Sequence, residues 1–490
     1  VLAAGKRSIT VAVHKNQQII ALWPGFHEKA YGVAVDVGST TIAAHLCDLA
    51  SGEVLASAST MNPQIRFGED LMSRVSYVMM HPEGADEMTV VIRQALNRLF
   101  LEAVEEIGAE IEDILEVSLV ANPIMHHILL GISPVELGGA PFALTTDAAV
   151  EMPTAELDLK INGGGRIYIL PCIAGHVGAD TAGMILSEEP QLQDKMTLLV
   201  DVGTNAEIVL GNSQRLLACS SPTGPAFEGA QISCGQRAAT GAIERVRINS
   251  ETLEPRFKVI GSELWSDEEG FTDAIANHGV TGICGSGIIE VVAEMYLAGI
   301  VTVDGIVDGD LIGRTSRIIK NDRTWSYVLH TPDSDETQIV VTQNDIRQIQ
   351  LAKAALYAGV KLLMDHIDTD HIERIRLAGA FGSHINVQHA MVLGLIPDCV
   401  LEQVSSAGNA AGTGARIALL NAESRNVIET LVKNIEKIET ALEPKFQDYF
   451  VDAMAFPNKK DPFPNLFSVV DKPKEKVGQD SAGGRKRRRR

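Results

Sequence analysis

The chain has 490 residues, of which 45 % are apolar and 5 % aromatic, and its net charge is −21. This length predicts roughly two to four domains, and the apolar content excludes a disordered chain. Residues 485–490 carry six positive charges, so the rest of the chain carries −27, which argues against nucleic acid as the main partner. No stretch approaches the ~18 consecutive apolar residues of a membrane helix, and no signal peptide is visible. We therefore expect a cytoplasmic protein with no membrane partner.

The first elements in the chain are strands. Residues 7–21 alternate like a short hairpin, and because the chain opens at Val1 in mid-pattern we expect a domain that began further upstream. Strands are predicted at 31–35, 41–47 and 54–59, and helical periodicity follows at 70–80 and 88–107. A strand at 117–121, a helix at 124–130, a strand at 166–170 and a helix at 179–186 complete this part.

The same order of elements then restarts. Strands are predicted at 197–200, 207–210 and 215–218, then helices at 286–298 and 345–366, a strand at 374–377, and helices at 387–393, 410–421 and 426–442. The segment Val33–Thr41 also matches Leu198–Ala206, at an offset of 165 residues. Two copies of one pattern, each between apolar strands, indicate an internal duplication.

Each copy contains an acidic, glycine-containing turn between two strands. Gly38 and Gly203 are expected to adopt positive φ and to let a ligand approach the backbone, and successive N–H groups in such a turn bind anions. Asp36 and Asp201 suit Mg²⁺, which prefers hard oxygen ligands and retains several waters. The turns thus predict a site for nucleotide phosphates, unless they are ordinary hairpin turns. Hydroxyl and amide donors to phosphate are Ser39, Thr40, Thr41, Thr204 and Asn205.

Three further segments are rich in glycine. In residues 375–383 a strand runs into small residues, which allow a base and ribose to lie against the backbone; Gly379, Ala380, Phe381 and Gly382 are the predicted adenosine contacts. Residues 282–287 and 408–414 open helices, and we interpret them either as close-packed connectors or hinges between lobes, or as N-caps formed by Ser286 and Asn409.

These motifs carry a family resemblance. Asp36–Thr41, Asp201–Asn205 and 377–382 resemble the phosphate-1, phosphate-2 and adenosine motifs of the acetate and sugar kinase, Hsp70 and actin superfamily. More narrowly, the chain resembles the ATPase portion of the reductive activators of corrinoid proteins. The further segments that carry this resemblance are 62–64, 121–126, 177–180, 224–229 and 408–412. The implied fold is α/β, a duplicated actin-like (ribonuclease H-like) two-lobed ATPase. The expected domains are a middle or linker remnant at 1–30, a first lobe at 31–190, a second lobe with the adenosine site at 191–460, and a disordered basic tail at 461–490, which could alternatively dock an acidic partner or anionic surface.

The resemblance also implies an activity. Members of the family couple ATP and Mg²⁺ to the reduction of an inactive Co(II) corrinoid protein to Co(I), serving a methyltransferase system. Their electron comes from an N-terminal plant-type 2Fe–2S domain, which we expect only in the full-length protein. The resemblance adds Gly224 to the nucleotide-binding residues and leaves a homodimer open.

Other polar residues are candidates for catalysis or for packing. Asp180 and Glu207 could orient a water molecule, although Asp180 could instead stabilise a helix N-terminus. His126, His127 and His176 are interpreted as packing or capping residues. The cysteines have neither Cys-x-x-Cys pairs nor the clustered spacing of a metal site, so we expect buried thiols in a reducing compartment. They are Cys47, Cys172, Cys219, Cys234, Cys284 and Cys399.

Three other functions stay open on the sequence. A small-molecule kinase of the same fold would need a carboxylate base beside a substrate hydroxyl, and none is identified. An activator of 2-hydroxyacyl-CoA dehydratases would hold a 4Fe–4S cluster between paired cysteines, against which the scattered cysteines argue. A non-enzymatic chaperone-like or actin-like scaffold is the third.

Overall fold

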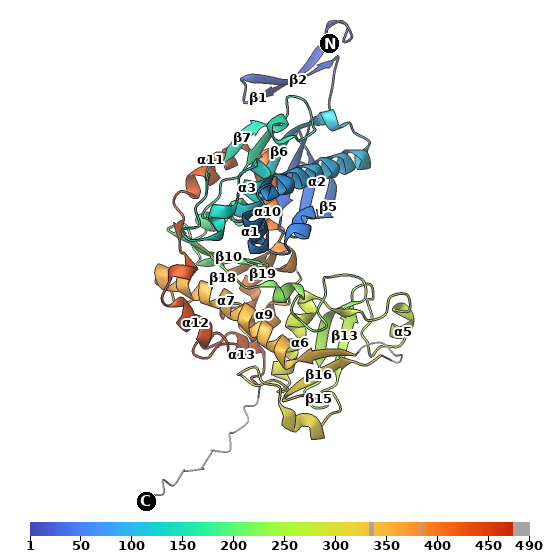
Figure 1. The fold of residues 1–490 in the computed structure, drawn as a ribbon, viewed down its shortest axis with the longest axis vertical. Coiled ribbons are helices and arrows are strands. Elements are labelled where there is room, and N and C mark those ends of the chain that lie inside the picture. Colours follow the sequence, from blue (N-terminus) through green and yellow to red (C-terminus); the bar gives the residue numbers. More distant parts are fainter. Residues whose placement is uncertain (333–337, 383, 474–490) are drawn as a thin grey trace, which may run out of the picture. The chain divides into compact units, whose positions relative to one another are not determined.

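The computed structural model describes residues 1–332, 338–382 and 384–473, without the side chains of Ala380 and Phe381. These residues form two compact units, which are described separately (Figure 1). Unit 1 consists of Val1–Pro225, Ala354–Val387 and Ile396–Val451, and unit 2 of Ala226–Lys353, Gln388–Leu395 and the chain from Asp452 onward.

The first half of unit 1 is built on a six-stranded sheet with the order β5-β4-β3-β6-β8-β7. β3 pairs antiparallel with β4 and parallel with β6, which in turn pairs parallel with β8. The strands are β3 (Tyr31–Val37), β4 (Thr41–Asp48), β5 (Val54–Met61), β6 (Ile114–Ala121), β7 (Val150–Pro153) and β8 (Arg166–Ile169). The helices are α1 (Leu71–Met80), α2 (Gly84–Ile107), α3 (Pro123–Leu130) and α4 (Ala179–Glu188).

The second half repeats this topology. Its six-stranded sheet has the order β20-β11-β10-β9-β18-β19, in which β9 pairs antiparallel with β10 and parallel with β18. Five strands correspond in order to those of the first sheet, and the sixth strands, β7 and β20, lie at opposite edges. The strands are β9 (Thr197–Val202), β10 (Ala206–Gly211), β11 (Leu216–Ser221), β18 (Arg374–Ala378), β19 (Val404–Gly408) and β20 (Glu436–Lys437). The helices are α7 (Gln343–Ile367), which begins in unit 2, α8 (Gly379–Gly382), α10 (Ala410–Leu420), α11 (Ala422–Leu431) and α12 (Phe446–Asp452). The predicted duplication is therefore confirmed.

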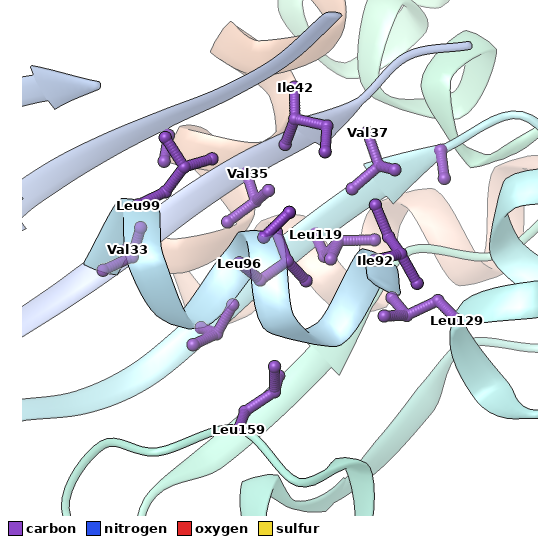
Figure 2. Close-up of a cluster of buried hydrophobic side chains, with 14 of the residues drawn as sticks. Val33, Val35, Val37, Ile42, Ile92, Leu96, Leu99, Leu119, Leu129 and Leu159 are labelled. Atoms are coloured by element: carbon purple, nitrogen blue, oxygen red, sulfur yellow. The ribbon is translucent and has the colours of Figure 1, made fainter. Parts of the chain in front are cut away.

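The main core of the first half lies between its sheet and α2. The valines of β3 alternate toward α2, whose apolar residues recur at helical spacing, and both sets are buried. Figure 2 shows Val33, Val35 and Val37 facing Ile92 and Leu96 across this core. Because aliphatic residues dominate it, the low aromatic content of the chain does not prevent a close-packed interior.

A direct helix crossing joins the two halves of unit 1. α4 packs against α10, and the contact passes through glycines: a Cβ added to Gly414 would lie 2.1 Å from the carbonyl oxygen of Gly183, and one added to Gly183 would lie 2.8 Å from that of Ala411. The two helix backbones therefore touch without intervening side chains.

The chain begins with the predicted hairpin, β1 (Ile9–His14) and β2 (Gln18–Pro24). It contacts the first half through His14, whose Nε2 lies 2.8 Å from the Glu151 carboxylate, and through Ile20, whose carbonyl oxygen would be 2.0 Å from a Cβ at Gly164.

Unit 2 consists of small sheets and helices. Its sheets have the orders β13-β12-β14 and β15-β16-β17. Glu290 of α6 is fully buried and accepts hydrogen bonds from Arg245 and Arg247 at 3.0 and 2.6 Å. The elements are β12 (Ala242–Ile248), β13 (Pro255–Val259), β14 (Gly282–Ile283), β15 (Ile318–Asn321), β16 (Thr324–His330), β17 (Ile339–Thr342), α5 (Phe271–Ala274), α6 (Gly285–Leu297), α9 (Val387–Leu393) and α13 (Leu466–Val469). Of the tail expected at 461–490, the basic run at 485–490 lies outside the described residues.

Two local predictions are wrong. The helix expected at 426–442 ends at Leu431, because the following residues form β20 and pair in parallel with β11. Ser286 is not an N-cap: Cys284 occupies that position, and the Ser286 hydroxyl donates to the carbonyl of Glu244. The Asn409 cap is confirmed, since its side chain accepts from the Gly412 N–H at 2.7 Å. Among the described residues, no helix combines the length and apolar character required to cross a membrane.

Candidate nucleotide site

The two acidic turns connect the first two strands of each sheet, as predicted. The Gly38 N–H donates to the Thr41 carbonyl at 3.0 Å, and the Gly203 N–H donates to the Asn205 carbonyl at 3.1 Å. The expectation of positive φ is wrong for both glycines. Gly38 is required instead because the backbone of Thr41 lies close to it: a Cβ at Gly38 would lie 2.7 Å from the Thr41 carbonyl oxygen.

The carbonyls of the first turn are held from behind by Asn62. Its side-chain amide donates to the Gly38 carbonyl and its backbone N–H donates to the Thr40 carbonyl, both at 2.8 Å. In a trans peptide the carbonyl and the next residue's N–H point in opposite directions. The N–H groups of Ser39 and Thr41 are therefore directed away from Asn62.

The second turn is held in the same way by Thr223. The Thr223 hydroxyl shares its single proton between the carbonyls of Gly203 and Thr204, at 2.7 and 2.9 Å, and the Gly224 N–H donates to the Thr204 carbonyl at 2.9 Å. Gly224, predicted from the resemblance to contact the nucleotide, thus uses its N–H to fix the turn. The Asn205 N–H is directed away from this support.

Four carboxylates lie close to these turns. Asp36 and Asp201 occupy equivalent places near the ends of β3 and β9. Glu207 is the cross-strand partner of Asp201, so the two side chains stand on the same face of the sheet. The equivalent partner of Asp36 is Ala43, so this acid is present in only one of the duplicated halves. Asp180 lies in the first turn of α4 and accepts from the Thr181 N–H at 2.7 Å.

Burial raises the pKa of all four carboxylates, and neighbouring charges add to this for Asp36, Asp201 and Glu207. Burial raises the pKa of Asp36 to about 7, the charge of Asp180 adds to this, and a hydrogen bond from Asn409 opposes it. Burial, together with the charges of Asp180 and Asp36, also raises the pKa of Asp201 to about 7. Burial raises the pKa of Asp180 to about 6 against the hydrogen bonds at the start of α4. Burial and the charges of Asp180 and Asp201 raise the pKa of Glu207 well above its usual value.

The charge of Asp36 raises the pKa of Asp201, which indicates that the two acidic turns lie near each other within unit 1. Over the described ranges, no group of three or more His, Cys, Asp or Glu side chains is arranged to hold a metal ion by itself. The assignment of Mg²⁺ to Asp36 and Asp201 stays a prediction.

The predicted adenosine segment starts beside Asp201. Ala378, the last residue of β18, pairs with Asp201. Gly379 follows with φ +83°, and a Cβ there would lie 2.2 Å from Oδ1 of Asp201. Glycine is therefore needed at this position, because a side chain would collide with the Asp201 carboxylate. The side chains of Ala380 and Phe381 lie outside the described residues, and the adenosine role of 379–382 stays a prediction.

A small cavity of about 170 Å³ lies beside Glu207 and Asn205. Much of its wall is apolar, from residues such as Leu71, Met72 and Ile124. His176, which also lines it, packs against the ring of Phe142 at 4.4 Å. The cavity extends the site away from the turns, and its polar lining residues include Asn122, Ser220 and Glu439.

Sequence reasoning missed the residues that support the turns. Asn62 directly follows β5, and Thr223 lies shortly after the end of β11. Each residue thus stands just beyond the third strand of its half, so the duplication itself is the signal that could have found them.

Comparison with known proteins bears out the resemblance. One family model, described as the C-terminal domain of RACo, the ASKHA domain, matches residues 195–467, and another, the RACo middle region, matches residues 31–193. The corrinoid activation enzyme RamQ of Eubacterium limosum is 33 % identical over 434 residues, which cover 86 % of this chain and 70 % of that protein.

Two further relatives agree. The reductase of the Co(II) methylated amine-specific corrinoid protein of Methanosarcina barkeri is 23 % identical over 447 residues, covering 87 % of this chain and 77 % of that protein. The solved structure of a reductive activator for a corrinoid, iron-sulfur protein matches with a TM-score of 0.80 and 31 % identity, covering 93 % of this chain and 71 % of that one. The chain therefore belongs to the RACo family, whose C-terminal portion is an ASKHA domain.

Proposed function

We propose that this protein is an ATP-dependent reductive activator, which uses ATP and Mg²⁺ to promote the reduction of a Co(II) corrinoid protein to Co(I) in a methyltransferase system. The observation that supports it most directly is the group of four carboxylates beside two anion-binding turns. The names of its relatives, a corrinoid activation enzyme and a corrinoid protein reductase, supply the class of partner.

The residues present fit a magnesium nucleotide. Four neighbouring carboxylates with raised pKa values form a site short of positive charge. Mg²⁺ commonly binds through one or two carboxylates plus substrate phosphates and water, so the lack of a complete protein cage is compatible with it. Bound there, Mg²⁺ would neutralise the phosphates and polarise the terminal phosphoryl group.

The chain's own groups then have distinct roles. The outward N–H groups of Ser39, Thr41 and Asn205 bind phosphate oxygens. Asp36 and Asp201 would hold the hydrated cation in their ionised forms. Glu207, facing Asp201, accepts a proton from the attacking water or orients it. Asp180 is a second candidate for that role, and its contact with the start of α4 also suits simple helix stabilisation.

Coupling to the cobalt follows from linkage. Nucleotide can shift a conformational equilibrium only by its different affinity for the two states. If the nucleotide-bound state binds the corrinoid protein and weakens a cobalt axial ligand, each increase of about 59 mV in the one-electron potential favours reduction tenfold.

The electron must come from a separate centre. All six cysteines are free thiols, five of them buried, and they do not gather into a cluster site within the part of the chain that is described. We propose a 2Fe–2S cluster of the full-length protein as the donor.

The test is Co(I) formation under anaerobic conditions. A panel of Co(II) corrinoid proteins, including the methylated amine-specific one, would be mixed with this chain and a low-potential chemical reductant, with and without ATP and Mg²⁺. We expect ATP to increase the rate with at least one of them, and Asp201→Ala to abolish the increase while Glu53→Gln, which alters an exposed carboxylate, preserves it. A phosphorylated sugar or acid formed in place of Co(I) would instead establish the kinase function; the cavity of about 170 Å³ is smaller than usual substrate pockets.

A further inference from the structure

A buried arginine lies directly behind the first phosphate turn. Arg74, on α1, has no exposed surface. Its guanidinium donates from Nη2 to the Ser39 carbonyl at 2.5 Å, from Nε to the Gly68 carbonyl at 3.0 Å, and from Nη1 to the Met125 sulfur at 3.2 Å. Each terminal nitrogen and the Nε therefore has an acceptor, and one of these acceptors belongs to the turn.

The contact with Ser39 completes the support of the turn. Asn62 holds the carbonyls of Gly38 and Thr40, and Arg74 holds the carbonyl between them. Since each peptide is planar and trans, the Thr40 N–H is directed away from Arg74. No hydrogen bond from the N–H of Ser39 or Thr40 occurs within the described residues, so these donors are available to an anion.

Within the described residues, the guanidinium of Arg74 forms no direct ion pair with a carboxylate. No acidic oxygen of the described residues lies within 4.0 Å of its guanidinium. Asp70, the nearest acid that acts on it, caps the start of α1 by accepting from the Ser73 N–H at 2.7 Å. Burial lowers the pKa of Arg74 to about 10, which leaves it charged at neutral pH. A buried charge without a directly paired counter-charge is costly, and the open side of the turn is where an anion could compensate it.

We propose that Arg74 is a positioning residue that fixes the first turn in its phosphate-binding conformation and supplies the positive charge behind it, so that a nucleotide phosphate becomes its counter-anion across the Ser39 peptide. The proposal rests on the nucleotide site of the proposed function. Three acceptors in different directions match the planar guanidinium, whereas a lysine ammonium could not reach all three in the same geometry. The second turn has the neutral Thr223 in the corresponding role, so the two turns differ in electrostatic strength.

The experiment compares ATP with adenosine, which carries no phosphate. Binding of ATP and of adenosine to the 490-residue chain is measured by calorimetry for the wild type, Arg74→Met, Arg74→Lys and the control Arg66→Met. Arg66 is exposed and lies over the ring of Phe67 at 4.6 Å, so its replacement removes the same charge nearby without touching the turn.

We expect Arg74→Met to weaken ATP binding at least about tenfold and adenosine binding by less than about twofold, with Arg74→Lys between it and the wild type, and Arg66→Met unchanged. Equal weakening of ATP and adenosine, or unchanged ATP affinity, would overturn the proposal. If circular dichroism shows that Arg74→Met does not fold, the same comparison of ATP and adenosine binding is made with Arg74→Lys. Failure of the wild type to bind ATP would refute the nucleotide site itself, a different result from loss in the variant alone.

Discussion

Replacing Asp201 with asparagine should make the nucleotide-free protein more stable at neutral pH, although the residue belongs to the proposed active site. Asp201 lies opposite Glu207 and is influenced by Asp36 and Asp180, and no hydrogen bond from the described residues lowers its pKa against this repulsion. Asparagine has nearly the same shape and carries no charge, so it relieves the repulsion without leaving a cavity.

The magnitude follows from the pKa of Asp201, which burial and its acidic neighbours raise from 3.8 to about 7. At about 1.4 kcal/mol per pKa unit, ionising this group in the folded protein costs up to about 4 kcal/mol above pH 7. Neighbouring carboxylates relieve part of the cost by taking up protons, so we expect about 1–3 kcal/mol at pH 7.5. At pH 5 the Asp201 carboxyl is mostly protonated in the folded protein, so the increase in stability caused by Asp201→Asn should fall to about 1 kcal/mol or less.

The sign is fixed by linkage. The folded state binds the proton more tightly than the unfolded state, so the contribution of Asp201 to wild-type stability is largest below about pH 4 and is lost as the pH rises through about 7. Asp201→Asn should remove that part of the pH dependence. The free energy of unfolding of unit 1 would be measured by urea denaturation at pH 5.0 and 7.5, without nucleotide or Mg²⁺.

Glu53→Gln is the matched control, because it removes an exposed carboxylate from the loop between β4 and β5; its stability should change little at either pH. Magnesium and ATP should stabilise the wild type more than Asp201→Asn. A variant that is less stable than the wild type at pH 7.5, or that gains equally at both pH values, would refute the electrostatic reasoning.

Three other substitutions test the site and its framework. Gly379→Ala should strain the backbone by about 1–3 kcal/mol, because φ is +83°, and should displace the Asp201 carboxylate. Turnover in a Mg²⁺-dependent ATPase assay should therefore fall by a larger factor than adenosine affinity measured by calorimetry. Gly414→Ala should lower the free energy of unfolding by about 1–3 kcal/mol despite alanine's higher helix propensity, because its Cβ meets the Gly183 carbonyl. A higher free energy of unfolding in urea denaturation would contradict the close backbone contact between α4 and α10. Thr223→Val should cost about 1–2 kcal/mol of ATP affinity, measured by calorimetry, whereas Thr223→Ser keeps the hydroxyl and should bind nearly as the wild type.

The parts of the fold that the sequence predicted are those with strong local signals. The valines of β3 alternate beside the acidic turn, and α7 has sustained helical periodicity over 25 residues. The duplication adds a second signal, because it assigns both turns and their acids to equivalent positions in the two halves.

The error at 426–442 has a physical cause. Apolar residues recur there at helical spacing through Ile435, Ile438 and Leu442, but the first two are buried beside a strand and Leu442 is 72 % exposed. The pairing of β20 with β11 joins residues more than 200 positions apart, as at Leu217 and Glu436. Local periodicity cannot reveal such a contact.

The supporting residues of the site were missed for a similar reason. An isolated arginine at position 74 in an amphipathic helix reads as a solvated charge, and only the tertiary fold brings it to the Ser39 carbonyl. Glu207 was identified as an acid near the second turn, but the strength of its coupling to Asp201 depends on the register of β9 and β10.

The glycine contact between α4 and α10 has a mechanical consequence. Side chains at a helix interface can change rotamer and absorb small shifts, but two backbones in contact have no such freedom. A displacement of α4, whose first turn carries Asp180, must therefore be transmitted to α10, whose N-cap Asn409 bonds to Asp36. Stiffness at a single crossing would thus couple Asp180 to Asp36, two acids of the first half, through a helix of the second half.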